Sequence, residues 1–200
     1  MSMFDAYETG FEETWRDTTE LLWRPALRGP REIKATDFLE PVLQLLHGTV
    51  FESGGRFYLR QPGIGNLEST LLAEGQRKLA MIARLVSNGV LLEGGYLFWD
   101  EPEANLNPKS LRVVAKVILQ LAENGAQIFV STHSMYLLRE LQMGADDFPQ
   151  VTPAFIGLVR EEDADGDSAV VAELRSDLDE LSYIASLEAE LEHADRYLSW

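Results

Sequence analysis

Residues 96–108 read YLFWDEPEANLNP, and residues 128–134 read IFVSTHS. Each stretch opens with a short apolar run that has the length and the aromatic or β-branched content of a buried strand. The first run ends in Asp100 and Glu101, and the second is followed shortly by His133. Polar side chains that follow buried parallel strands project from the carboxyl edge of a sheet, where ligands bind in open α/β folds. The pattern therefore predicts both a fold and a candidate site.

The segment between the two runs predicts a helix from Pro108 to about Glu123, since proline suits the first helical turn and Asn124-Gly125 can end the helix. Strand, helix and strand joined by short connections predict an α/β fold with two neighbouring parallel strands. Thr36 and Ser134 are expected to cap helices. The wider periodicity predicts helices over residues 5–23, 36–46, 75–87, 134–141 and 177–198, a β-hairpin over 49–61, a loop over 62–66, and strands over 152–160 and 168–174.

The composition limits what the chain can bind and where it works. Its formal net charge of −16 argues against a broad nucleic-acid-binding surface, because phosphate contacts need clustered Lys and Arg. The absence of cysteine excludes disulfides and cysteine-type zinc sites. With no secretory signal and no apolar stretch of bilayer length, we expect a cytoplasmic protein that does not enter a membrane. The basic residues Arg24, Arg28, Arg31 and Lys34 are interpreted as solvated surface, and a small basic patch is the alternative.

The residues at the two predicted strand ends are suited to nucleotide hydrolysis. Asp100 is placed to hold Mg²⁺ through a water, because Mg²⁺ keeps several of its waters. Glu101 is placed to orient or deprotonate the water that attacks a γ-phosphate. His133 could donate a hydrogen bond to a γ-phosphate oxygen. An acidic pair at a strand end is also a common surface feature, and that interpretation stays open for these residues taken alone.

A third element begins at LAEGQ, residues 72–76, which opens the predicted helix over 75–87. Gly75 allows a close backbone approach, and the free N–H groups at a helix N-terminus attract an anion. Many helices begin with small residues, so this feature alone indicates little.

Together these elements resemble the ABC-type head domain of AAA-family ATPases, near the RecF, SMC and OLD proteins. LAEGQ resembles the signature motif, LFWDEP the Walker B motif, EANLNP the D-loop and STHS the histidine switch. The resemblance implies a P-loop NTPase-like α/β fold, of which this chain is the C-terminal lobe with parallel strands flanked by helices, plus N-terminal helices and a β-hairpin. It divides the chain into a helical and hairpin segment (1–70), the motif-bearing lobe (71–145), and C-terminal strands with an acidic helix (146–200).

The resemblance also assigns roles and partners. It implies ATP and Mg²⁺ as cofactors, and a dimer of heads in which the signature helix of one head contacts the γ-phosphate held by the other. Glu101 and His133 would be catalytic, and Asp100 would hold the metal. The nucleotide-contacting and seam residues would be Ala73, Glu74, Gly75, Gln76, Asn105 and Asn107. Ala73 and Glu74 depart from the serine and glycine of the transporter signature LSGGQ.

A further departure concerns the phosphate loop. The pattern G-x-x-x-x-G-K-[ST] occurs nowhere in the 200 residues, so another segment or subunit would have to supply it. The function expected is ATP hydrolysis by the complete assembly, with the isolated chain inactive. The alternative is a non-enzymatic module that binds and regulates a complete ATPase. Such heads work in DNA repair and phage defence, so a nucleic-acid or nuclease partner in the full system stays open.

A weaker pattern lies in EEDADGDS, residues 161–168, where Asp163, Asp165 and Asp167 resemble the start of a calcium loop. The twelfth position of such a loop needs a glutamate, but Leu174 stands there. An Asp-Gly hairpin turn is the preferred interpretation.

Overall fold

The computed structural model describes residues 13–92, 94–162 and 168–200. The chain divides into two compact parts. The first part comprises Met1–Leu97 with Asn124–Gln127, and the second comprises Phe98–Glu123 with Ile128–Trp200. No helix among the described residues is both long and apolar enough to cross a bilayer.

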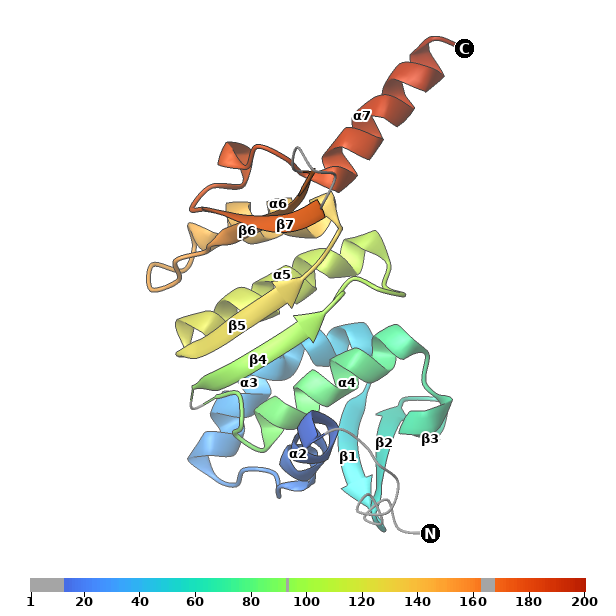
Figure 1. Cartoon of the computed structure of the whole chain (residues 1–200). Coiled ribbons are helices and arrows are strands. Elements are labelled where there is room, and N and C mark those ends of the chain that lie inside the picture. The colour runs from blue at the N-terminus through green and yellow to red at the C-terminus, as the bar shows by residue number, and fades with distance from the viewer. Residues whose placement is uncertain (1–12, 93, 163–167) are drawn as a thin grey trace. The chain divides into compact units, whose positions relative to one another are not determined.

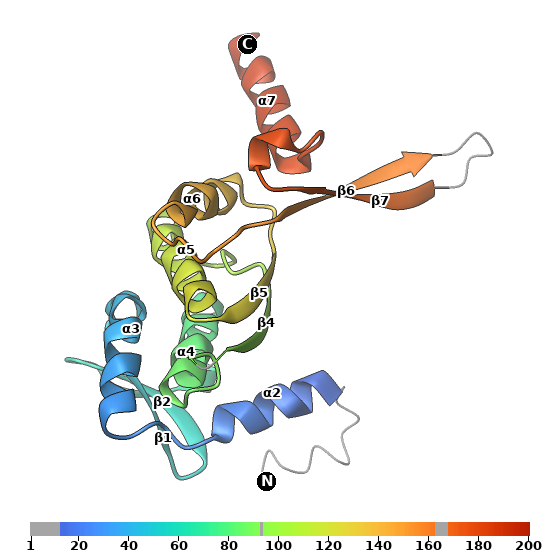
Figure 2. The same ribbon diagram turned by 90° about the vertical axis from the view of Figure 1, so that its left-hand side faces the viewer.

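The first part combines helices with a small antiparallel sheet (Figures 1 and 2). Helix α3 packs against helix α4, and Val42, Leu46, Leu59 and Val86 are fully buried in this part. The predicted hairpin is confirmed, with Glu52 opposite Phe57 next to its Gly54-Gly55 turn. The elements are α2 (Glu13–Trp23), α3 (Pro30–Leu46), β1 (Thr49–Ser53), β2 (Arg56–Gln61), β3 (Gly65–Glu68), a 3₁₀ turn (Ser69–Leu71) and α4 (Glu74–Ser87), with sheet order β1-β2-β3.

Two sequence expectations for this part are wrong. Helix α3 begins at Pro30, so Thr36 is not its cap. Gly29 adopts a φ of 69°, which starts the helix early, and the Thr36 hydroxyl donates instead to the carbonyl of Glu32 at 2.9 Å. The expected loop over 62–66 is also too long, because Gly65 already pairs with Gln61 as the first residue of β3. The start of the helix expected over 5–23 lies outside the described residues.

Strands β4 (Gly95–Asp100) and β5 (Ala126–Ser131) pair with each other, and α5 (Pro108–Glu123) connects them. Figure 1 shows the two arrows pointing the same way, as the sequence predicted. The bounds of α5 match the predicted helix, since Pro108 opens it and Gly125, with a φ of 93°, follows its end. The carboxyl ends of both strands lie in the second part of the chain.

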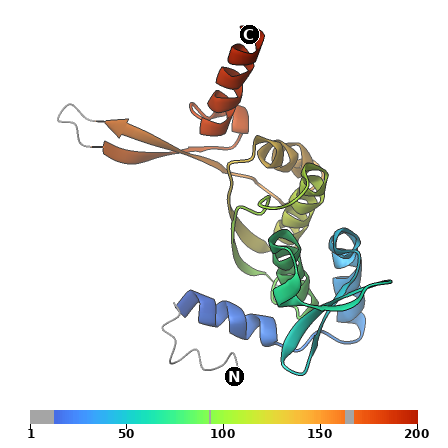
Figure 3. The ribbon, with the colours of Figure 1, turned by 90° about the vertical axis from the view of Figure 1, so that its right-hand side faces the viewer.

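The second part also contains α6 (Met135–Ala145), whose first residue contributes to a small core. Ser134 caps this helix as predicted, because its Oγ accepts a hydrogen bond from the N–H of Leu137 at 3.2 Å. Strands β6 (Phe155–Glu162) and β7 (Ser168–Arg175) form an antiparallel hairpin, drawn in orange in Figure 3. Met135, Phe155 and Leu178 form a small core beneath it. The acidic turn and the calcium-loop pattern fall on residues 163–167, outside the described part of the chain.

The helix expected over 177–198 is interrupted. A 3₁₀ turn (Leu178–Glu180) comes first, and α7 starts only at Ala185 and runs to Leu198. Between them Ser182 is tied to β7, because its N–H and its hydroxyl both donate to Glu173, at 2.9 and 2.6 Å. Leu181 packs against Gly157 of β6. These contacts with the hairpin explain why the segment before Ala185 does not continue the helix that its periodicity predicted.

Candidate functional site

The carboxyl ends of β4 and β5 are tied together one residue beyond the strands. The N–H of Glu101 donates to the carbonyl of Ser131 at 2.8 Å. Glu101 itself adopts a left-handed backbone with a φ of 44°, which turns the chain sharply after Asp100. Asp100 is exposed at the end of β4. A non-glycine residue in this conformation is uncommon, and such strain concentrates at functional sites.

Glu101 and His133 meet at this edge. The Nδ1 atom of His133 lies 2.9 Å from Oε1 of Glu101, with exposed side-chain fractions of 74% and 44%. The contact means that a neutral imidazole carries its proton on Nδ1 and presents an unprotonated Nε2. In this arrangement His133 can donate a hydrogen bond to a phosphate through Nε2 only as the imidazolium.

Glu103 is the residue that sequence reasoning missed. Its side chain is 9% exposed, and its Oε1 accepts hydrogen bonds from the hydroxyl of Thr132 at 2.5 Å and from the N–H of His133 at 3.3 Å. Its Oε2 is buried with no hydrogen-bond partner among the described residues. One carboxylate thus holds the two residues that follow β5. The available signal was a third acidic residue in DEPE, but its partner lies 29 residues away in sequence.

The same hydrogen-bond network continues into α6. The N–H of Ser134 donates to Oγ1 of Thr132 at 3.0 Å, and Ser134 in turn caps the helix. The loop over residues 132–134 is therefore fixed at both ends, by Glu103 on one side and by the helix on the other.

The signature-like residues lie at the start of α4, in the first part of the chain. Ala73 is the N-cap residue and makes no side-chain capping hydrogen bond. Glu74 is exposed, Gly75 is buried and Gln76 is partly buried. The contact of this helix start with a nucleotide stays a prediction.

The two asparagines of the D-loop-like segment have local structural roles. Asn105 adopts a φ of 61°, a left-handed conformation that asparagine tolerates well. The side-chain oxygen of Asn107 accepts from the N–H of Lys109 at 3.0 Å and so caps α5. Their role at a dimer seam stays a prediction.

The donor set fits Mg²⁺ only in part. Asp100 is an exposed residue that carries a carboxylate, the ligand type that Mg²⁺ prefers. Across residues 13–92, 94–162 and 168–200, no three acidic, His or Cys side chains converge on a possible metal position. Since Mg²⁺ keeps several waters and binds substrate phosphates, one carboxylate is compatible with such a site.

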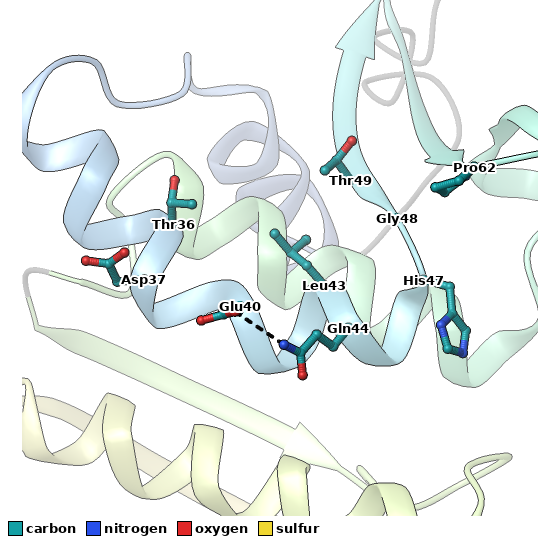
Figure 4. Close-up of a pocket in the computed structure, with 9 residues that line it drawn as sticks. All are labelled: Thr36, Asp37, Glu40, Leu43, Gln44, His47, Gly48, Thr49 and Pro62. Atoms are coloured by element: carbon teal, nitrogen blue, oxygen red, sulfur yellow. Dashed lines mark hydrogen bonds between the residues drawn. The ribbon is translucent and has the colours of Figure 1, made fainter.

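A shallow groove of about 520 Å³ lies in the first part, between α3 and the segments around β1 and β2 (Figure 4). Glu40 and Gln44, which face it, are hydrogen bonded to each other at 3.3 Å. The lining residues are Thr36, Asp37, Glu40, Leu43, Gln44, His47, Gly48, Thr49 and Pro62. None of the predicted site residues lines this groove.

Residues 10–139 match the family described as "AAA domain, putative AbiEii toxin, Type IV TA system". A "Putative ABC transporter ATP-binding protein" of Archaeoglobus fulgidus is 31% identical over 124 residues, which cover 60% of this chain and 37% of that protein. The glutamine transport ATP-binding protein GlnQ of Geobacillus stearothermophilus is 33% identical over 88 residues, covering 42% of this chain and 35% of the relative. The matches thus span little more than a third of these relatives.

Solved structures agree on the fold. An Smc head domain with a coiled coil and joint from Pyrococcus yayanosii aligns with a TM-score of 0.51 at 19% identity, covering 80% of this chain and 29% of that one. An Smc head bound to the C-winged helix domain of ScpA aligns with a TM-score of 0.50 at 17% identity, covering 78% of this chain and 53% of that one. The fold is that of a P-loop NTPase head of the ABC and SMC type, as the motifs predicted.

Proposed function

The chain belongs to the AAA-domain family that matches its residues 10–139, and we propose that it forms the catalytic C-terminal lobe of an ABC-type ATPase head. The observation that carries this proposal is the contact between Glu101 and His133, 2.9 Å apart at the ends of neighbouring strands. It brings together an ionisable base and an imidazole 32 residues apart in sequence, at the sheet edge where such folds bind ligands.

In this proposal each residue has a defined task. Glu101 orients and deprotonates the attacking water, and Asp100 holds Mg²⁺, which supplies charge neutralisation at the phosphates. His133 contacts a γ-phosphate oxygen through Nε2 when the ring is protonated. The start of α4, from Ala73 to Gln76, contacts the nucleotide bound by the opposite head of a dimer.

The phosphate loop comes from another segment or another chain. The sequence contains no G-x-x-x-x-G-K-[ST], whose backbone cradle and lysine would grip the phosphates. Phe98 of β4 and Phe129 of β5 stack with ring centroids 4.7 Å apart, yet are 75% and 41% exposed. A solvent-facing aromatic pair on a two-stranded sheet supports a covering segment, and the greater length of the matched relatives leaves room for one.

The test is the substitution Glu101→Gln, assayed after the tagged chain has been used to capture a P-loop-bearing partner. We expect the kcat for MgATP hydrolysis to fall by roughly 100-fold or more, the range of general-base effects, with ATP still bound. Glu190→Gln on the exposed face of α7 is the matched control and should leave turnover unchanged. The isolated chain should show no turnover. Wild-type hydrolysis rates in the Glu101→Gln assembly would refute the catalytic proposal.

The second candidate is a non-enzymatic module that regulates a complete ATPase, and the missing phosphate loop is the observation that favours it. The same substitution separates the two. A regulator would change the turnover of its partner equally in its wild-type form and in the Glu101→Gln variant, whereas a catalytic lobe would not.

A further inference from the structure

We propose that Glu103 is a positioning residue that sets His133 against Glu101, an inference that rests on the proposed function of this site. Its Oε1 receives the Thr132 hydroxyl at 2.5 Å and the N–H of His133 at 3.3 Å. The imidazole Nδ1 lies 3.8 Å from the same oxygen but 2.9 Å from Glu101. Glu103 therefore holds the backbone of the histidine, and Glu101 receives its ring.

The burial of Glu103 supports a functional reason for its presence. Taking a carboxylate out of water costs free energy unless its oxygens are hydrogen bonded. Oε1 is well satisfied, but Oε2 is buried without a partner among the described residues. Packing alone gives no reason for a carboxylate at a position this buried.

The second line of support is geometric. The residues after β5 have few ways to move while Glu103 is in place, because Thr132 is bonded to it on one side and to the N–H of Ser134 at 3.0 Å on the other. Without the carboxylate the loop loses two hydrogen bonds, and the ring no longer has a fixed direction toward Glu101. Misplacing a reacting group by about 1 Å can cost about 100-fold in rate.

The experiment measures the tautomer of His133 in the full chain, which needs no nucleotide. Long-range ¹H–¹⁵N correlation at about pH 8.5, roughly two units above the ordinary histidine pKa, reports which ring nitrogen carries the proton. The other histidines are His47 and His193, so His133→Gln assigns the signal. We expect the Nδ1–H form in the wild type, a shift toward Nε2–H in Glu103→Ala, and retention in Glu103→Gln, whose side-chain oxygen can still accept.

Thr132→Val provides a milder variant, because it removes one donor and keeps the carboxylate; it should shift the tautomer partly. Glu180→Ala, at an exposed site in the same part of the chain, should not shift it. In the assembly with its P-loop-bearing chain, Glu103→Ala should lower kcat for MgATP about 10- to 100-fold with little change in KM.

An unchanged tautomer in both Glu103→Ala and Thr132→Val would overturn the positioning role. That result leaves the proposed function standing if Glu101→Gln still abolishes turnover. The proposed function is refuted instead if Glu101→Gln retains full turnover, whichever tautomer His133 adopts.

Discussion

At the scale of single residues, the backbone of Glu101 links sequence to chemistry. A left-handed conformation costs an L-residue roughly 1–2 kcal/mol, which the N–H bond to Ser131 and the contact with His133 help to offset. The turn allows Pro102 to be buried directly afterwards while the Glu101 side chain stays half exposed. The left-handed turn thus leaves the Glu101 carboxylate accessible to solvent although the next residue is buried.

Glu173 offers a pH test at the same scale. Hydrogen bonds from the hydroxyl and the N–H of Ser182, and then the charge of Arg175, lower the pKa of the Glu173 carboxyl below its ordinary value. A lowered pKa stabilises the fold above the unfolded value of about 4.3, and this stability is lost as the pH falls through the folded value. We expect the free energy of unfolding to fall below that pH, and to fall less steeply in Ser182→Ala.

Urea unfolding at pH 7, 4 and 3 measures this difference. Ser176→Ala, an exposed neighbour on the same segment, is the control and should follow the wild type. Identical pH profiles for Ser182→Ala and wild type would contradict the assignment.

At the scale of secondary-structure elements, α4 supports α2 through buried polar side chains. The guanidinium of Arg84, 8% exposed, donates to the carbonyls of Leu22 at 3.0 Å and Arg24 at 2.8 Å. Asn88 donates to the carbonyl of Leu21 at 2.8 Å. These carbonyls lie at the end of α2, where a helix leaves acceptors without partners and favours positive charge. Burial lowers the pKa of the Arg84 guanidinium.

Arg84→Met should therefore destabilise the first part of the chain by about 2–3 kcal/mol, because it removes the charged donor of two partly buried hydrogen bonds while keeping the apolar stem. Arg77→Met on the exposed side of the same helix should change stability by less than about 0.5 kcal/mol. Chemical denaturation followed by circular dichroism compares the two. Equal effects would show that the guanidinium makes no special contribution.

The elements also show what sequence can predict. Helix α5 and the strands on either side of it were predicted because proline, Asn-Gly and apolar runs act locally. The interruption before α7 was not predicted, because it depends on contacts of Leu181 with β6 and of Ser182 with β7. The periodicity of a sequence carries no information on such contacts. The candidate site divides in the same way. Glu101 and His133 could be predicted because they follow apolar strands in the sequence. The role of Glu103 could not, because it depends on the hydroxyl of Thr132, which is distant in sequence.

At the scale of the whole molecule, the aromatic pair of Phe98 and Phe129 is the surface on which the proposed phosphate-loop segment would pack. Their rings are nearly parallel, with 6° between the ring planes, and Phe98 is the more exposed of the two. Stacking of this kind stabilises the sheet by only about 0.5–1.5 kcal/mol, whereas covering the pair would remove a large apolar surface from water.

Phe98→Gln should therefore lower the stability of the isolated chain by about 1 kcal/mol or less. It should weaken binding to a captured P-loop-bearing partner about 30-fold, the equivalent of a hot spot of about 2 kcal/mol. Tyr136→Gln, at another exposed aromatic residue, on α6, is the control and should bind normally. Isothermal titration of the two variants against that partner gives the ratio of dissociation constants. Equal affinities would mean that the aromatic face is not where the phosphate-loop segment packs, and the source of the missing loop would have to be sought at another surface.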